Sequence, residues 1–370
     1  MPGGLATLET GSPADGCFLL VPAAGKLHNA AMIKRFIPTR FALPACVLAA
    51  ALAPVFAADN SFLGSWELTI PGGGAGWLGI MKEDGYYDAG LLWGGGSVMP
   101  MDAVFFTDDS LWVTRVFEVK RKDAGGAVVR TQRFTEAIIA KVDGDNLEAT
   151  RLIPRENGEG VRREAFTGKR TPPMPLAPDL SQVKFGDPIT LFNGQDLTGW
   201  RLTDPGAASG WSVQDGLLVN RVAQTPGQPH KNYGNLRTDR EFEDFNLTLE
   251  TRLAKGGNSG VYLRGIYEVQ VADTYGRPLD PHNMGAVYSR IKPTAAAEKP
   301  AGEWQSLDIT LVDRHVTVVL NGQKIIDNQP VLGCTGGALW SDVLRPGPIY
   351  LQGDHTGIEY RNIVLRPVVK

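Results

Sequence analysis

The chain has little net charge and few cysteines. Its 37 Lys and Arg nearly balance its 40 Asp and Glu, which gives a formal net charge of -3. Nucleic-acid-binding proteins usually carry a basic patch, so this balance argues against a nucleic-acid partner. Of the 3 cysteines only Cys334 lies beyond the N-terminal region. We therefore predict no internal disulfide in the folded part, whose stability must depend on its hydrophobic cores.

The sequence also lacks long helical periodicity. After about residue 60, no apolar pattern of helical period extends beyond a turn or two. Short alternating runs are instead separated by turn residues, in a chain with 44 Gly and 25 Pro. This pattern predicts an all-β protein of about two domains.

The N-terminal region resembles an export signal. Lys34, Arg35 and Arg40 form a basic segment around the start of an apolar run over residues 41–56, and Ala57 closes a small-residue cleavage sequence. We interpret residues 1–57 as an upstream extension followed by a signal peptide that begins at Met32. The mature protein is then expected to be periplasmic or secreted.

Two alternatives concern the same apolar run. A membrane anchor is disfavoured because the run is short and ends in small residues. Lipid attachment at Cys46 is disfavoured because more apolar sequence follows this cysteine. We therefore expect no integral membrane span in the mature chain.

A proline-rich segment divides the remainder. Residues 171–178 contain four prolines in eight positions, which favours an extended, semi-rigid spacer. We predict a small antiparallel β-domain over residues 58–170, a linker over 171–186 and a second β-domain over 187–370.

Two alternating runs near the centre of the second domain predict a pair of half-buried strands. Their apolar positions are Val261, Leu263, Val269 and Val271. The opposite face carries four polar side chains, which are Tyr262, Arg264, Glu268 and Gln270. A sheet face with a phenol, a guanidinium, a carboxylate and an amide has more polar chemistry than solvation needs, so we place the candidate site there.

An ordered set of motifs in this domain resembles a known family. The motifs are Leu191-Phe192-Asn193-Gly194-Gln195-Asp196-Leu197-Thr198-Gly199-Trp200, Gly257-Asn258-Ser259-Gly260, Tyr267-Glu268-Val269-Gln270, Gly302-Glu303-Trp304, Leu320-Asn321-Gly322 and Leu351-Gln352-Gly353-Asp354-His355. Residues 187–368 are similar to the 3-keto-disaccharide hydrolase family, long known as a domain of unknown function. One departure is Gly353, which is inserted into the usual Gln-Asp-His stretch.

The resemblance implies both a fold and a substrate class. The implied fold is a concanavalin A-like jelly-roll sandwich, here preceded by the smaller antiparallel β-domain. The implied substrates are glycosides or oligosaccharides oxidised to a ketone at sugar carbon 3. Because the ketone acidifies the proton on carbon 2, a base can remove it, an enolate can expel the group on carbon 1, and water can then add. The route needs a base, an electrophile for the enolate oxygen and a leaving-group acid.

We predict Glu268 and His355 as the catalytic residues. Glu268 would be a general base or a metal ligand, and His355 a base, an acid or a ligand, because its intrinsic pKa lies near neutrality. The cofactor is undetermined. A divalent metal cation would take these two residues as ligands and could replace Arg264 in stabilising the enolate. The predicted substrate-binding residues are Asn258, Arg264, Gln270, Asp273, Tyr288, Trp340 and Gln352.

Other interpretations remain open. Glu268 could only form a salt bridge with Arg264, and His355 could be a plain loop residue. A non-catalytic, lectin-like module would need amides and aromatics but no ionisable cluster. A conventional glucanase would pair Glu268 with Asp273 across a β-bulge, but the residue between them that shares this face is an amide rather than a carboxylate.

Overall fold

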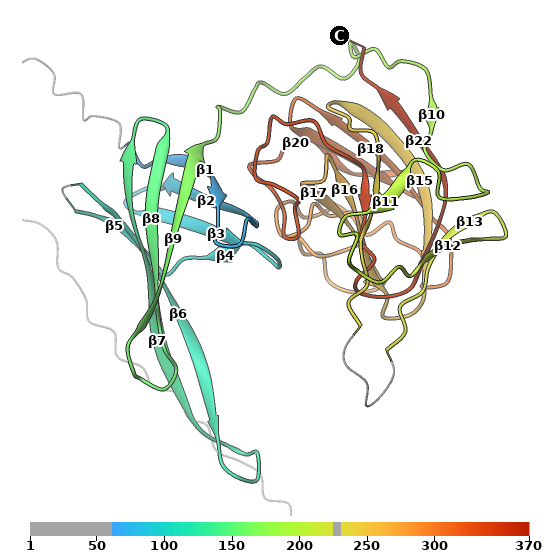
Figure 1. Ribbon diagram of the computed structural model, residues 1–370. Helices are drawn as coiled ribbons and strands as arrows, with labels where there is room; N and C mark the ends of the chain where they lie inside the picture. The colour runs from blue at the N-terminus through green and yellow to red at the C-terminus, as the bar shows by residue number, and fades with distance from the viewer. Residues whose placement is uncertain (1–60, 108, 225–230, 370) are drawn as a thin grey trace, which may run out of the picture. The chain divides into compact units, whose positions relative to one another are not determined.

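The computed structural model describes residues 61–369 except 108 and 225–230. Within these ranges the regular structure consists of strands alone (Figure 1). No helix in the described part of the chain is long and apolar enough to cross a membrane. The predicted extension and signal peptide over residues 1–57 lie outside the described residues, so export and localisation stay predictions.

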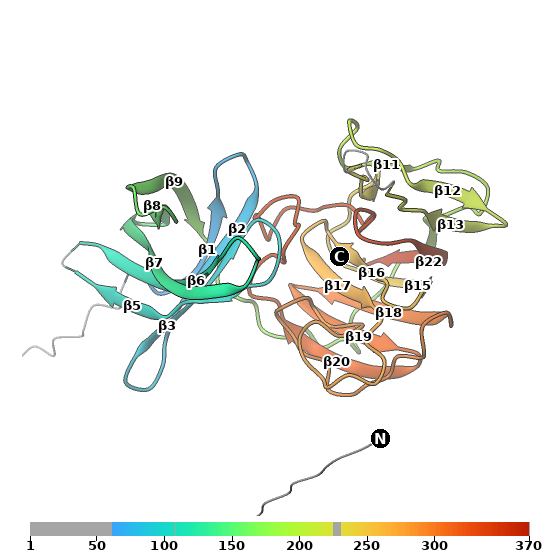
Figure 2. The same cartoon turned by 90° about the horizontal axis from the view of Figure 1, so that it is seen from below.

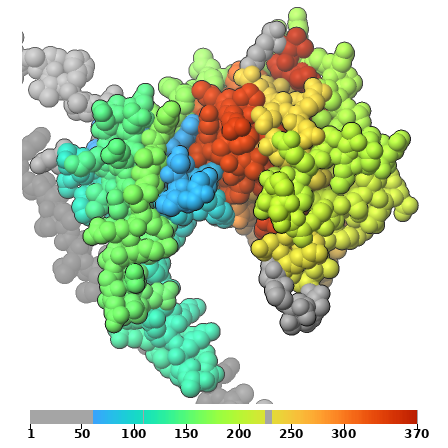
Figure 3. All heavy atoms as spheres, in the orientation of Figure 1, coloured from blue at the N-terminus to red at the C-terminus, as the bar shows by residue number. Residues whose placement is uncertain are grey.

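The first sheet contains nine antiparallel strands. In spatial order they are β4 (Met99–Pro100), β3 (Tyr87–Trp93), β2 (Ala75–Lys82), β1 (Gly64–Thr69), β9 (Val161–Arg170), β8 (Asn146–Pro154), β7 (Val128–Asp143), β6 (Leu111–Lys122) and β5 (Ala103–Phe106). Strands β6 and β7 form a long hairpin that stands clear of its sheet, as Figure 3 shows. Asp143 pairs with Asn146 across the expected turn, where Gly144 has a φ of 58°.

Two further antiparallel sheets are formed by the rest of the described chain (Figure 2). The larger contains β12 (Trp211–Gln214), β13 (Leu217–Asn220), β22 (Ile358–Pro367), β15 (Phe245–Leu253), β18 (Gln305–Val312), β19 (His315–Leu320) and β20 (Gln323–Pro330), with β10 (Ile189–Thr190) beside β22. The smaller contains β11 (Trp200–Leu202), β14 (Leu236–Thr238), β21 (Tyr350–Leu351), β16 (Asn258–Leu263) and β17 (Tyr267–Ala272). This is the predicted all-β jelly-roll sandwich.

None of the named strands of the first sheet pairs with the other two sheets in the described part of the chain. The segment between β9 and β10 contains the proline-rich sequence and no named strand. The division into two domains with a linker over 171–186 remains a prediction, because all described residues fall within one compact unit.

The hydrophobic core of the sandwich is built by period-2 alternation. Along β15 every second residue is buried, and these residues pack against the apolar faces of β16 and β17. The core positions of β16 and β17 are Val261, Leu263, Val269 and Val271, which confirms the predicted alternation. Burying one such side chain contributes roughly 1.5–3 kcal/mol.

The prediction that Arg264 continues the polar face is wrong. Strand β16 ends at Leu263, and the next two residues, Arg264 and Gly265, have φ values of 54° and 68°. The backbone N–H of Ile266 donates to the carbonyl of Leu263 at 3.1 Å, which closes the turn. Positive φ at both central residues is typical of the I′ hairpin turn. Arg264 therefore leaves the strand alternation.

Arg264 instead anchors the chain segment before β21. Its side chain is buried, and its Nη2 donates to the carbonyls of Val343 at 2.8 Å and Arg345 at 2.7 Å. Its Nε also donates to Arg345, at 3.2 Å. The guanidinium thus holds an irregular segment against the hairpin, and Glu268 does not form the alternative salt bridge with it.

We expect Arg264→Leu to lower the free energy of unfolding clearly. Each buried carbonyl that loses its donor costs roughly 1–3 kcal/mol. Urea unfolding measures the change, with Arg201→Leu as the control, because Arg201 pairs with Asp239 at an exposed position where ion pairs contribute little. Equal stability of the two variants would contradict the anchoring role.

Candidate active site

The polar faces of β16 and β17 line a cavity of about 190 Å³. Tyr262, Glu268 and Gln270 all reach it. The strand register places Tyr262 opposite Glu268 and Gly260 opposite Gln270. Directly opposed residues share one face of a sheet, so the three side chains gather at one place.

Most other lining residues of the cavity come from parts of the chain outside β16 and β17. The other lining residues are Gly95, Gly96, Asn235, Asn258, Tyr288, Gly336, Gly337, Tyr350, Gln352, Asp354 and His355. The cavity is therefore assembled mainly by the smaller sheet and the loops around it.

Glu268 is the buried carboxyl group of the cavity. Its side chain is only 4% exposed, and Tyr262 Oη donates to its Oε2 at 2.9 Å. Burial raises the pKa of Glu268 to about 8, although the hydrogen bond from Tyr262 and the charge of His355 act in the opposite direction. Glu268 is therefore mostly neutral at pH 7.

Two stacked tyrosines support this carboxyl group. The ring centroids of Tyr262 and Tyr350 lie 3.9 Å apart, and the angle between the two ring planes is 10°. Tyr262 Oη also lies 2.7 Å from the carbonyl of Gly336, and Tyr350 Oη donates to the carbonyl of Gly337 at 3.0 Å. Burial raises the pKa of both phenols, so they stay neutral. Tyr262 can donate to an ionised Glu268, or to Gly336 when Glu268 holds the proton.

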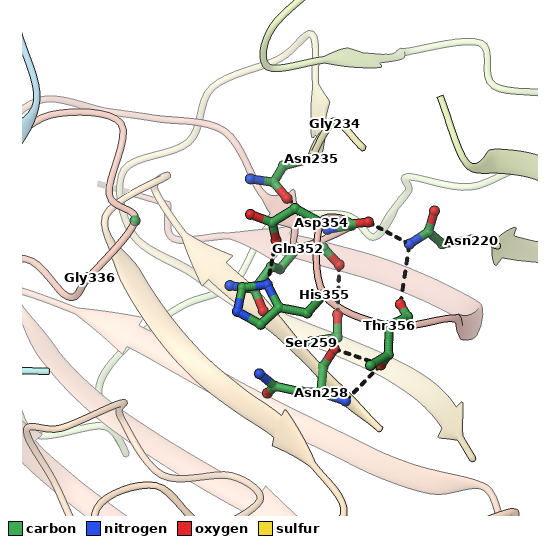
Figure 4. Close-up of polar contacts among 12 residues, drawn as sticks. Asn220, Gly234, Asn235, Asn258, Ser259, Gly336, Gln352, Asp354, His355 and Thr356 are labelled. Carbon is green, nitrogen blue, oxygen red and sulfur yellow. Dashed lines mark hydrogen bonds and ion pairs between the residues drawn. The ribbon is translucent and has the colours of Figure 1, made fainter. Parts of the chain in front are cut away.

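His355 is presented by a loop after β21 (Figure 4). Its Nδ1 lies 2.7 Å from Asp354 Oδ1, and this hydrogen bond raises the pKa of His355. Gly353 N donates to Asn235 Oδ1 at 2.7 Å, and Asn220 Nδ2 donates to the Gly353 carbonyl at 3.0 Å. The loop contacts hold His355 at the cavity, and the hydrogen bond to Asp354 favours its protonated form.

The inserted glycine has a packing reason. A Cβ on Gly353 would lie 2.6 Å from both the carbonyl oxygen of Gly234 and Nε1 of Trp211. Next along the loop, Thr356 Oγ1 accepts from Asn258 N at 2.7 Å and donates to the Asn258 carbonyl at 2.9 Å. These contacts fix the loop that carries His355.

Three amide oxygens around the cavity have no hydrogen-bond partner within the described part of the chain. They are Asn258 Oδ1, Gln270 Oε1 and Gln352 Oε1, all buried. An unpaired buried acceptor costs roughly 1–3 kcal/mol, and such groups are rare in native proteins. Their convergence fits a ligand with many hydroxyl donors, such as a sugar.

Tyr288 reaches the cavity because a chain segment covers the edge of the smaller sheet. Strand β17 is the last strand of that sheet. Gln270 N donates to the carbonyl of Ala286 at 2.9 Å, and Tyr288 N donates to the carbonyl of Glu268 at 3.0 Å. This pairing places Tyr288 beside Glu268.

Six predicted site residues line the cavity, namely Asn258, Glu268, Gln270, Tyr288, Gln352 and His355. Three others do not. Arg264 is the turn anchor, and Asp273 Oδ2 accepts from Gly256 N at 2.7 Å. The register of β16 and β17 is regular, without the bulge that would return Asp273 to the face of Glu268. Trp340 borders another cavity, with the Arg345 guanidinium 3.7 Å from its ring centroid.

Sequence reasoning missed several lining residues. Tyr350 lies two positions before Gln352, so period-2 alternation could have found it. Tyr262 was placed on the polar face but given no role, and Asp354 adjoins His355. Asn235 and the glycines come from distant loops and carry no local signal.

The predicted metal ligands do not make a metal site by themselves. Nowhere in the described ranges do three His, Cys, Asp or Glu side chains gather so that they could hold a metal ion. Glu268 is occupied by Tyr262, and His355 Nδ1 by Asp354. The residues present therefore do not fit a resident cation bound by protein groups alone.

Comparison with known proteins gives the family. Residues 187–366 match the 3-keto-alpha-glucoside-1,2-lyase-like domain. A 3-keto-disaccharide hydrolase from Bacteroides thetaiotaomicron is 26% identical over 166 residues, which is 38% of this chain. Residues 187–366 of the chain belong to this 3-keto-disaccharide hydrolase family. The match spans 57% of the length of that curated relative.

Solved structures also resemble part of this chain. A presumed glycosyl hydrolase from Parabacteroides distasonis is 33% identical, covers 49% of this chain and 84% of its own, and has a TM-score of 0.40. A non-specific endo-beta-1,3(4)-glucanase is 12% identical and has a TM-score of 0.33. The match covers 54% of this chain and 94% of the glucanase chain. The family match therefore gives residues 187–366 carbohydrate-active, hydrolase-like relatives.

The family match also decides between two cavities. A larger one of about 1000 Å³ is lined by Trp340 and by Glu67, whose pKa burial raises to about 7. Most of its lining residues lie between positions 67 and 169, outside the family segment. All polar side chains of the smaller cavity lie within 187–366. We therefore assign the smaller cavity as the candidate active site.

We expect Glu268→Gln to stabilise the protein at pH 8 but hardly at pH 5. The unfolded carboxyl has a pKa near 4.5 and the folded one near 8. Between these values the folded state keeps a proton that the unfolded state releases, so the free energy of unfolding falls as pH rises. Glutamine removes this loss. Urea unfolding of both proteins at the two pH values measures it.

Glu250→Gln is the matched control. Its hydrogen bond from Arg361 lowers the pKa of Glu250, so this carboxylate stabilises the fold above its unfolded pKa, and its removal should weaken the protein at pH 8. If Glu268→Gln and the wild type share one pH dependence, Glu268 does not have the raised pKa.

Proposed function

We propose that the protein cleaves 3-keto-glycosides or 3-keto-disaccharides by elimination followed by hydration. The observation that supports this most is one buried carboxyl with a raised pKa beside three amide oxygens that have no hydrogen-bond partner among the described residues. We also propose, from the sequence alone, that it acts in the periplasm or outside the cell.

The proposed first step is proton removal. The Glu268 carboxylate takes the proton from carbon 2, and the released electron pair forms the enolate with carbon 3. The enolate then re-forms the ketone, a carbon 1–carbon 2 double bond appears, and the bond to the leaving oxygen breaks. His355, whose protonated form Asp354 favours, supplies the proton to that oxygen. Water finally adds its hydroxyl to carbon 1 and a proton to carbon 2.

A raised pKa suits Glu268 to this role. A general base works best when its pKa lies near the operating pH, and a carboxylate with a pKa near 8 is a stronger base than an exposed one. The Tyr262 hydroxyl stabilises the ionised form at the moment when it is needed. As a base Glu268 requires ionisation, so the limb of kcat/KM that reports Glu268 should rise with pH up to about 8, and kcat/KM should fall where His355, the proton donor, loses its proton. As an acid it would give the reverse.

The size of the cavity supports a small substrate. Its volume of about 190 Å³ is below the roughly 300–1,000 Å³ of pockets for drug-sized ligands. A cavity of this size has room for about one sugar ring. A lectin or an endo-acting glucanase for long chains would need a more extended surface.

The conventional two-carboxylate mechanism has weaker support. Its expected partner, Asp273, is bound to Gly256 outside the cavity. The second carboxylate that does line the cavity, Asp354, is taken up by His355. Because it is hydrogen-bonded to His355, Asp354 is better placed to stabilise this proton donor than to act as a nucleophile at carbon 1.

Turnover of a 3-keto-disaccharide, compared with the unoxidised parent sugar, tests the proposal. We expect release of sugar from the oxidised substrate alone, with loss or exchange of deuterium placed at carbon 2. Glu268→Gln should reduce the rate by roughly 10²–10⁴-fold, the usual contribution of a general base, while Glu250→Gln keeps it. Cleavage of the parent alone would favour the glucanase, and cleavage of neither would favour the lectin.

Gly260→Ala should have a similar but smaller effect. A Cβ at this position would lie 2.3 Å from Glu268 Oε1 and 2.8 Å from its Cγ, so the carboxyl must move. A displacement of about 1 Å can cost on the order of 10²-fold in rate. The same turnover assay measures it, with Gly125→Ala as the control in the β6–β7 turn. A fully active Gly260→Ala protein would contradict the placement of Glu268.

A further inference from the structure

The cavity is not built by the jelly roll alone. Gly95 and Gly96 line it, and both lie between β3 and β4 of the first sheet. We call residues 94–98 the glycine loop. The family match begins at residue 187, so this wall comes from outside the family segment.

The glycine loop contacts the backbone that supports the tyrosine pair. Gly337 N donates to the Gly94 carbonyl at 3.2 Å. A Cβ on Gly336 would lie 2.1 Å from the Gly96 carbonyl oxygen, and one on Gly337 would lie 2.8 Å from Tyr262 Oη. Gly336 and Gly337 are thus held between the loop and the tyrosine that donates to Glu268, with no space for a side chain.

Ser97 makes the polar side-chain contacts of the glycine loop. Its Oγ lies 2.9 Å from His282 Nε2 and donates to Tyr288 Oη at 3.3 Å. A serine hydroxyl has one proton, so when it donates to Tyr288 it accepts from His282, which requires a proton on Nε2 of His282 while its Nδ1 lies 3.4 Å from Asp280 Oδ1. Tyr288, as the acceptor, keeps its own proton free for another oxygen. Because Tyr288 lines the cavity, that proton is available to a sugar.

Neighbouring contacts keep the loop in place. Val98 N donates to Ser289 Oγ at 2.9 Å. Trp77 of β2 belongs to the hydrophobic core of the jelly roll, with the Arg290 guanidinium 4.2 Å from its ring centroid. A Cβ on Gly333 would lie 2.3 Å from Trp77 Cδ1. The first sheet is therefore packed tightly beside the site.

We infer that the glycine loop is a substrate-binding element, and that Ser97 is a positioning residue that orients the Tyr288 hydroxyl toward a sugar oxygen. This inference rests on the proposed function. The loop presents only backbone at Gly95 and Gly96, so it limits one side of the cavity while leaving room for one ring.

Ser97→Ala tests the positioning role. We expect KM for a 3-keto-disaccharide to rise roughly three- to tenfold, the value of one hydrogen bond, with a smaller change in kcat. Ser97→Thr should restore most of the KM. The matched control is Ser341→Ala, because Ser341 Oγ donates to the Leu68 carbonyl at 2.6 Å and accepts from Gly76 N at 3.1 Å. That contact also joins the jelly roll to the first sheet but lies outside the cavity.

Gly95→Leu tests the loop as a wall. Gly95 does not have a positive φ, and a Cβ there would meet no atom within 4 Å, so the fold should tolerate the side chain. We expect KM to rise more for the 3-keto-disaccharide than for a 3-keto-glucoside with a small leaving group. Gly125→Leu controls for a leucine on a surface turn.

The outcomes separate the inference from the function on which it rests. Unchanged KM values in both Ser97→Ala and Gly95→Leu overturn the binding role of the loop while the function stands. An equal loss in Ser341→Ala and Ser97→Ala also overturns it, since the contact would then be structural only. A wild-type protein that neither binds nor cleaves any 3-keto sugar overturns the proposed function and this inference together.

Discussion

The burial of one carboxyl group, that of Glu268, is the constraint on which the site depends. An isolated carboxylate in a dry cavity is expensive, so the group is mostly neutral at pH 7 and needs a donor when it ionises. Tyr262 is that donor, and Tyr350 stacks on it. Gly260 has no side chain because the carboxyl group fills the space where a Cβ would lie.

The alternation of two short strands was enough to predict the inner half of this arrangement. Because side chains of a strand alternate between its faces, placing Val269 in the core placed Glu268 and Gln270 on the other side. The same reasoning failed at Arg264, since Arg-Gly is not the usual dipeptide of an I′ turn and the strand ended one residue earlier than expected. A turn residue no longer obeys the strand period, so its side chain could go to the carbonyls of Val343 and Arg345 instead.

The outer half of the site depends on contacts between distant residues. A family motif identifies His355. The residues that hold its loop are Asn220 and Asn235, which are more than 100 positions away in the sequence. Trp340, a predicted substrate-binding residue, follows Gly336 and Gly337 in the sequence. In the structure those glycines contact the glycine loop, and Trp340 packs beside Arg345. Local pattern gives no information about such packing, because it is decided by which surfaces meet.

Protection of a sheet edge and construction of the site are achieved by the same interaction. An uncovered edge strand exposes unpaired N–H and C=O groups that can recruit other chains, and the segment that ends at Tyr288 covers the edge of β17. By pairing with the backbone of Glu268, that segment brings the Tyr288 hydroxyl to the cavity, where Ser97 of the first sheet contacts it. Three parts of the chain thus meet around one strand. A change in any of them should alter how the proposed substrate is held before it alters the fold, because the hydrophobic core lies on the other face of the sheet.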